Sequence, residues 1–147
     1  MFHRYPFLSL LTFAYLGFVG WLTLTPTPIS SDNADLIQRL LVRLQRIDDL
    51  SWLTYNRLEF IANIGLFVPV GLFLLLLFGT RYWWVSALVG FAMTVAIETV
   101  QRSIPERFSD ERDILANTIG TLIGVAAGVV LTLPATLRRH RRRRAYA

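Results

Sequence analysis

The chain has 147 residues, of which 54% are apolar and only 17% are charged, whereas a soluble domain has about 45–50% apolar and about 25% charged residues. This composition excludes a large soluble enzyme and leaves room for about four membrane spans of about 20 residues each. The absence of cysteine excludes disulfides, thiolate metal sites and a cysteine nucleophile. The two histidines, His3 and His140, lie near the chain ends, so histidine catalysis is not expected.

Four segments are long and apolar enough to predict membrane-spanning helices, and they cover about residues 6–25, 59–79, 82–101 and 113–134. The first has no small-x-small cleavage site, so we expect a retained helix and not a signal peptide. We therefore predict an all-α fold, an integral membrane four-helix bundle that forms a single domain over residues 1–147.

The loop 26–58, between the first two predicted spans, carries apolar residues at helical spacing with arginines on the opposite face. The apolar residues are Leu36, Ile37, Leu40, Leu41, Leu44 and Ile47. This pattern predicts a short extracytoplasmic amphipathic helix. Two placements stay open: the helix lies on the outer leaflet, or it packs across the mouth of the bundle.

The basic residues are all arginines, and six of them lie between Arg138 and Arg144. A basic run can bind nucleic acid, but one that follows a long apolar segment is more typical of a cytoplasmic membrane anchor. We therefore interpret residues 138–147 as a cytoplasmic Arg-rich tail, with membrane lipid as partner and no nucleic acid. Four spans place both termini on one side of the membrane, and the denser arginines of that side predict cytoplasmic N- and C-termini.

Three polar residues in different predicted spans lie at similar depths. Asn63, Glu98 and Asn117 each lie three or four residues inside a span end, roughly 5 Å below the outer boundary at about 1.5 Å per residue. Because polar side chains inside a bilayer are costly, this agreement predicts one polar cavity that opens to the outside. Local structure explains Glu98 least, since a helix C-terminus disfavours a carboxylate.

One face of the fourth predicted span carries both polar residues and glycines. Asp113 and Asn117 share this face with a small-residue pattern that lets a neighbouring helix approach closely. In the second span, the ring of Pro69 should free a backbone carbonyl about one turn earlier and kink the helix. The residues assigned to helix packing are Pro69, Gly71, Gly120, Gly124 and Gly128.

The loop before the fourth span adds charges spaced three residues apart, at Arg107, Asp110 and Asp113. Asp110 could equally be an N-cap that needs no ligand, whereas for Asp113, beside Asn117, we favour a binding role. No metal site and no catalytic residue is assigned from this pattern. The complete candidate binding cluster comprises Glu59, Asn63, Glu98, Gln101, Arg107, Asp110, Asp113 and Asn117.

Ordered motifs on three of these spans resemble a known family. They are Asn63-x-x-x-Phe67-x-Pro69-x-Gly71, Glu98-x-x-Gln101 and Arg107-x-x-Asp110-x-x-Asp113-x-x-x-Asn117-x-x-Gly120-x-x-x-Gly124. The set, over about residues 59–128, resembles the VanZ-like family of small bacterial membrane proteins. The resemblance implies a four-span protein of the bacterial cytoplasmic (inner) membrane, whose named relative raises tolerance to teicoplanin-type lipoglycopeptides. It implies no known catalysis.

Three functions stay open. We favour a protein that binds the headgroup of an amphiphile, such as a lipid-linked cell-wall precursor or a lipoglycopeptide, and that needs no cofactor. The second is a membrane enzyme acting on a lipid headgroup, with Glu98 as general base and Asp110 and Asp113 holding a divalent cation; no nucleophile is recognised to support it. The third is a purely structural ion-pair network.

Overall fold

The computed structural model describes residues 6–25, 39, 42–43, 52, 54–104 and 111–145, with side chains described as far as residue 133. The elements of this part of the chain are α1 (Pro6–Leu24), α3 (Tyr55–Phe78), the short 3-10 helix η3 (Thr80–Tyr82), α4 (Trp83–Gln101) and α5 (Glu111–Ala145). Most of the predicted amphipathic helix lies outside the described residues.

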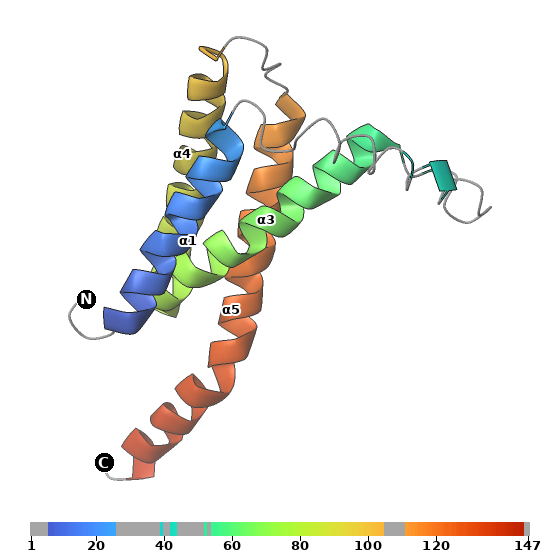
Figure 1. Cartoon of the computed structure of the whole chain (residues 1–147). Helices are drawn as coiled ribbons and strands as arrows, with labels where there is room; N and C mark the ends of the chain where they lie inside the picture. Colours follow the sequence, from blue (N-terminus) through green and yellow to red (C-terminus); the bar gives the residue numbers. More distant parts are fainter. Residues whose placement is uncertain are drawn as a thin grey trace.

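The predicted all-α membrane bundle is confirmed. Four helical segments are long and apolar enough to cross a membrane, and the described residues contain no strand; the segments are Pro6–Leu24, Tyr55–Phe78, Thr80–Gln101 and Glu111–Leu133. Successive spans run in opposite directions, so that α1 and α4 run one way and α3 and α5 the other (Figure 1). The N-terminus of α1 and the C-terminus of α5 therefore point toward the same end of the bundle.

Two helices are longer than the hydropathy pattern indicates. α3 begins at Tyr55, after Thr54 in an extended conformation, because the polar first turn continues the helix outside the apolar segment. α5 continues to Ala145, well past the predicted end at residue 134. Arginine, alanine and leucine are good helix formers, so the Arg-rich segment extends the same helix. Hydropathy indicates which residues can lie in a bilayer, but the helix can continue beyond that apolar segment.

The core lies where α3 crosses α1 and α4. Phe67, Val70 and Leu74 of α3 are buried against Val19 of α1 and Ile97 of α4. These contacts place α3 at the centre of the bundle, and the surrounding helices expose many large apolar side chains. Such exposure is what a surface facing lipid requires, since apolar patches of this extent are rare on soluble monomers.

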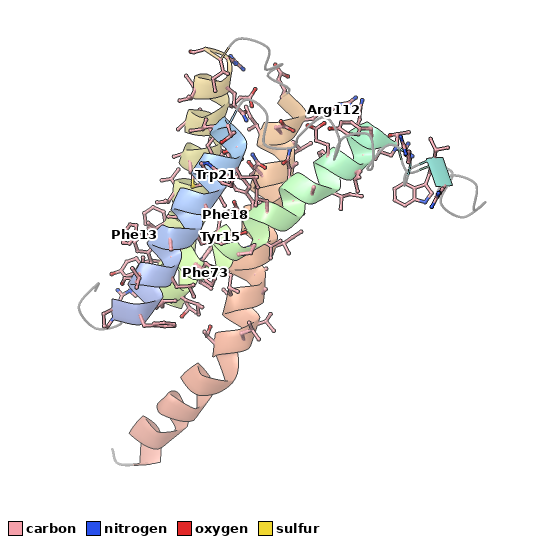
Figure 2. All side chains as sticks on the ribbon, viewed as in Figure 1. Phe13, Tyr15, Phe18, Trp21, Phe73 and Arg112 are labelled. Carbon is pink, nitrogen blue, oxygen red and sulfur yellow. The ribbon has the colours of Figure 1, made fainter. Side chains whose placement is uncertain are left out.

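The contact between α1 and α3 combines aromatic packing with one polar bond. The Tyr15 hydroxyl donates a hydrogen bond of 2.8 Å to the carbonyl oxygen of Leu66, and its ring meets Phe73 edge-on at 5.5 Å between centroids. Figure 2 shows Phe13, Phe18 and Trp21 along the same helix as Tyr15. The bonded carbonyl lies next to that of Gly65, which has no helical N–H donor at Pro69.

The most extensive helix contact joins α3 to α5, along what we call the glycine seam: Gly71, Gly120 and Gly124. A Cβ atom added to Gly124 would overlap the carbonyl oxygen of Val68 and lie 2.8 Å from the amide nitrogen of Leu72. Gly120 meets the carbonyl oxygen of Ile64 in the same way, and Gly71 meets that of Thr121. The seam brings the two backbones together and so sets how α3 and α5 are aligned.

Gly128 and Pro69 complete the set of predicted packing residues. A Cβ atom on Gly128 would meet the side chains of Leu72 and Leu75 and not backbone, so this position is less constrained than Gly124. Pro69 lies inside α3, which is helical on both sides of it. Its contribution to packing is therefore made within a continuous helix.

Candidate functional site

The seam places two predicted site residues in direct contact. The Asn63 side-chain amide of α3 donates a hydrogen bond of 2.8 Å to Asp113 Oδ1 in the first turn of α5. The two helices run in the same direction, so the side chains at this end lean the same way along both helices. Asp113 also benefits from its place at the N-terminus of α5, where the helix dipole favours a negative charge.

Glu98 and Gln101 reach the same end of the bundle from α4. Their exposed fractions are 3% and 7%, so both side chains point into the bundle and not into lipid. The Gln101 amide donates a hydrogen bond of 2.9 Å to the carbonyl oxygen of Thr23. Thr23 lies in the last turn of α1, where carbonyl oxygens lack partners within the helix. Gln101 therefore satisfies the C-terminus of α1.

The alignment of α4 with α5 shows how deep each polar residue lies. Gly90 of α4 contacts the side chain of Thr121 of α5, and the two helices run in opposite directions. Glu98 is eight residues beyond Gly90 and Asp113 eight residues before Thr121, so each lies about 12 Å toward the same end at about 1.5 Å per residue. Glu98 is thus level with Asp113, and Asn117 lies about one turn deeper, level with Thr94.

Asn117 is the most enclosed polar side chain of this group. It is 5% exposed, and its Oδ1 atom is buried without a hydrogen-bond partner among the described residues. The Asn117 backbone carbonyl, in contrast, accepts a 2.9 Å bond from the Thr121 hydroxyl. Within the described part of the chain, the amide oxygen is therefore an acceptor without a donor.

The structure thus brings a subset of the predicted residues to one end of the bundle, and we call this subset the polar cluster: Asn63, Glu98, Gln101, Asp113 and Asn117. Glu59 is exposed, one turn before Asn63 on α3. Arg107 and Asp110 lie outside the described residues. Three helices contribute to the cluster, while α1 contributes the backbone carbonyl of Thr23.

Two exposed arginines that were not predicted as site residues flank the cluster. Arg102 follows Gln101 directly, and Arg112 precedes Asp113 at the start of α5; Figure 2 labels Arg112 at this end of the bundle. Their position next to cluster residues in the sequence was the available signal. Cationic groups therefore lie at the rim, and carboxylate and amide groups lie inside.

The buried threonines of this region were also missed. Thr94 and Thr121 are 1% exposed, and their hydroxyls donate to backbone carbonyls one turn earlier, those of Gly90 and Asn117. Their sequence signal is weak because threonine satisfies itself in this way in any membrane helix. Among the described residues, no group of three or more carboxylate, histidine or cysteine side chains could hold a metal ion.

Comparison with known protein families gives a match over most of the chain. The VanZ/LLP1 family model matches residues 12–132, which extend from within α1 to the membrane-spanning part of α5. The match includes the whole polar cluster and the glycine seam. No curated protein and no solved structure matches the chain.

Proposed function

The chain belongs to the VanZ/LLP1 family, and from this premise we propose that its polar cluster binds the headgroup of an amphiphile of the cell envelope. The observation that carries the proposal is the convergence of Asn63, Glu98 and Asp113 on one end of a membrane bundle, with Glu98 only 3% exposed. Ionisable side chains within membrane spans are costly and concentrate at functional sites.

The arrangement of charges suits a headgroup that enters from the membrane surface. Arg102 and Arg112 are exposed at the rim, and guanidinium groups pair well with phosphate oxygens. Glu98, Asp113 and Asn117 lie further inside and present oxygen acceptors. A ligand with an anionic group near the surface and polar groups reaching inward fits this order. The apolar part of such a ligand can stay in the surrounding lipid.

The amphiphile that we propose is a lipid-linked cell-wall precursor or a teicoplanin-type lipoglycopeptide. Both require the polar cluster to face the outer leaflet of the bacterial cytoplasmic membrane, with both termini in the cytoplasm. In this arrangement the protein would contribute to lipoglycopeptide tolerance by binding either the antibiotic or its lipid-linked target.

Teicoplanin susceptibility tests the proposal in cells that express the parent, the double variant Glu98→Gln/Asp113→Asn, or the control Glu111→Gln. Glu111 is exposed in the same turn of α5 as Asp113, so the control removes a nearby charge outside the cluster. Membrane levels of all three proteins are matched by quantitative immunoblot. We expect the parent and the control to protect, and the double variant to lose protection.

The other outcomes contradict different parts of the proposal. If the parent gives no protection, the role in lipoglycopeptide tolerance is wrong. If the double variant protects as well as the parent at equal membrane level, the cluster is not the binding site and acts only as a structural network.

A further inference from the structure

Asn117 offers a hydrogen-bond acceptor that no other described residue uses. Its Oδ1 atom is buried without a partner among the described residues, although the side chain lies inside the bundle and is only 5% exposed. Buried polar atoms are satisfied in the great majority of native proteins, so each exception needs a physical explanation. In a membrane bundle the need is greater, because lipid supplies no hydrogen bonds.

Three donor groups at this end of the bundle each bond an acceptor other than Asn117 Oδ1. The Asn63 amide donates to Asp113, the Thr94 hydroxyl to the carbonyl of Gly90, and the Thr121 hydroxyl to the Asn117 backbone. These groups lie on α3, α4 and α5, and Asn117 Oδ1 has no bond to any group of the described residues. An incoming donor is therefore the simplest way to satisfy Oδ1.

The charges one turn above Asn117 indicate which donor fits. Glu98 and Asp113 lie level with each other, about 6 Å closer to the end of the bundle than Asn117 at about 1.5 Å per residue. Carboxylates attract a cation that also carries N–H groups, whereas an anionic group would be repelled from this depth. The exposed arginines at the rim suit the phosphate of the same headgroup.

We propose that Asn117 Oδ1 accepts a hydrogen bond from an ammonium or hydroxyl donor on the bound headgroup, with Glu98 and Asp113 favouring the ammonium. This inference rests on the proposed function, and it specifies the chemistry that the polar cluster selects. A quaternary ammonium headgroup, which has charge but no N–H, is then rejected.

The test uses the purified full-length protein in nanodiscs of phosphatidylcholine doped with increasing amounts of phosphatidylethanolamine. The thermal unfolding midpoint is the readout, because a lipid that binds the folded state raises it in a saturable manner. N-methyl and N,N-dimethyl phosphatidylethanolamine complete a series with three, two, one and no N–H donors at constant charge. A hexosyl diacylglycerol tests hydroxyl donors without charge.

For the parent, we expect saturable stabilisation by each lipid that retains an N–H donor, and none from added phosphatidylcholine. Binding should be lost abruptly at the third N-methyl group, which removes the last N–H donor. A gradual decline across the series would reflect headgroup size and would overturn the inference. If the hexosyl lipid also stabilises the protein, hydroxyl donors bind the same acceptor. If it does not, only the ammonium group binds there. This parent series holds even if a variant does not fold.

The variant Asn117→Leu removes the acceptor at similar volume. We expect its apparent affinity for phosphatidylethanolamine to fall by about tenfold or more, as for a lost hydrogen bond to a charged group. Its unfolding midpoint in pure phosphatidylcholine should be unchanged or higher, because an unsatisfied buried acceptor has been removed. A purely structural asparagine would show the opposite change in midpoint.

Ser86→Ala is the matched control. The Ser86 hydroxyl is fully buried without a partner among the described residues, but it lies in the first turns of α4, three turns from Glu98. We expect this variant to keep the parent affinity. If Asn117→Leu also keeps it, the inference is wrong, and the proposed function stands only if Glu98→Gln/Asp113→Asn weakens binding. If that double variant binds normally too, the proposed function fails as well.

Discussion

The two ends of the contact between α3 and α5 are built in opposite ways. Along the glycine seam, Gly120 and Gly124 remove side chains so that backbone meets backbone. One turn and more toward the other end, the same face of α5 carries Asn117 and Asp113, and Asp113 binds Asn63 through a side-chain hydrogen bond. Lipid provides no hydrophobic drive for helix association, so close packing and polar bonds must supply it.

The two ends therefore differ in what they contribute: one aligns the helices, and the other carries the polar side chains. The seam has no polar side chains and determines how α3 and α5 are aligned. The polar cluster depends on that alignment, because Asn63 can bind Asp113 only when α3 and α5 are aligned in this way. A single face of α5 therefore packs against α3 at its middle and carries polar side chains at its end. Substitutions can therefore break each part separately.

The largest effect is expected from Gly124→Ala. The added methyl group would overlap the carbonyl oxygen of Val68, which is backbone and has no flexible end to move. The helices must separate, and overpacking of this kind costs about 1–3 kcal/mol or more of the free energy of unfolding. Thermal or denaturant unfolding of the purified protein in detergent measures the loss.

Gly65→Ala is the matched control for this prediction. A Cβ atom at Gly65 would have nothing within 4 Å, although the residue lies in α3 and faces outward beside the seam. We expect a change within about 1 kcal/mol and in the stabilising direction, from the higher helix propensity of alanine. Equal losses from the two substitutions would contradict a specific role for the seam.

An intermediate effect is expected at the cluster end, where a double-mutant cycle on Asn63→Ala and Asp113→Ala isolates the 2.8 Å hydrogen bond. Each single variant should lower the free energy of unfolding by about 1–2 kcal/mol, because it removes a part-buried hydrogen bond to a carboxylate. The coupling energy should be about 1 kcal/mol, as for polar bonds between membrane helices. Strict additivity would mean that the bond contributes nothing to the alignment.

The smallest effect is expected from Tyr15→Phe, which tests a contact between α1 and α3, away from the contact between α3 and α5. The substitution removes the hydroxyl that binds the carbonyl oxygen of Leu66 and keeps the ring against Phe73. That carbonyl stays within a helix, so the loss should be about 0.5–1.5 kcal/mol. The response to doped phosphatidylethanolamine should not change. A loss as large as that from Gly124→Ala would make α1, and not the seam, the main support of α3.

Much of the fold could be predicted from the sequence because hydropathy acts locally. The positions of the four spans follow from the length of apolar segments, and they agree with the helices to within a few residues except at the start of α3 and the end of α5. The glycine face of α5 could be predicted in the same way, since residues on one face of a helix recur at a known spacing.

The candidate site could be predicted only in part from the sequence. Counting residues from the span ends predicted similar depths for Asn63, Glu98 and Asn117. In the structure, Gly90 of α4 contacts Thr121 of α5. This alignment puts Glu98 about one turn closer to the end of the bundle than Asn117. Gln101 was grouped with the site, whereas its amide satisfies the end of α1. For the arginines at the rim, Arg102 and Arg112, the only sequence signal was their position next to cluster residues.

The sequence by itself determined that this chain forms four membrane-spanning helices, and that one of them carries glycines and polar residues on a shared face, because both properties repeat within a single helix. Only the tertiary structure decided that Asn63 binds Asp113, that Gln101 binds the carbonyl of Thr23, and that the amide oxygen of Asn117 has no partner among the described residues. Each of these depends on which atom of another helix lies within about 3 Å. That distance is set by how the backbones approach at the glycine seam, which the periodicity of a single helix does not encode.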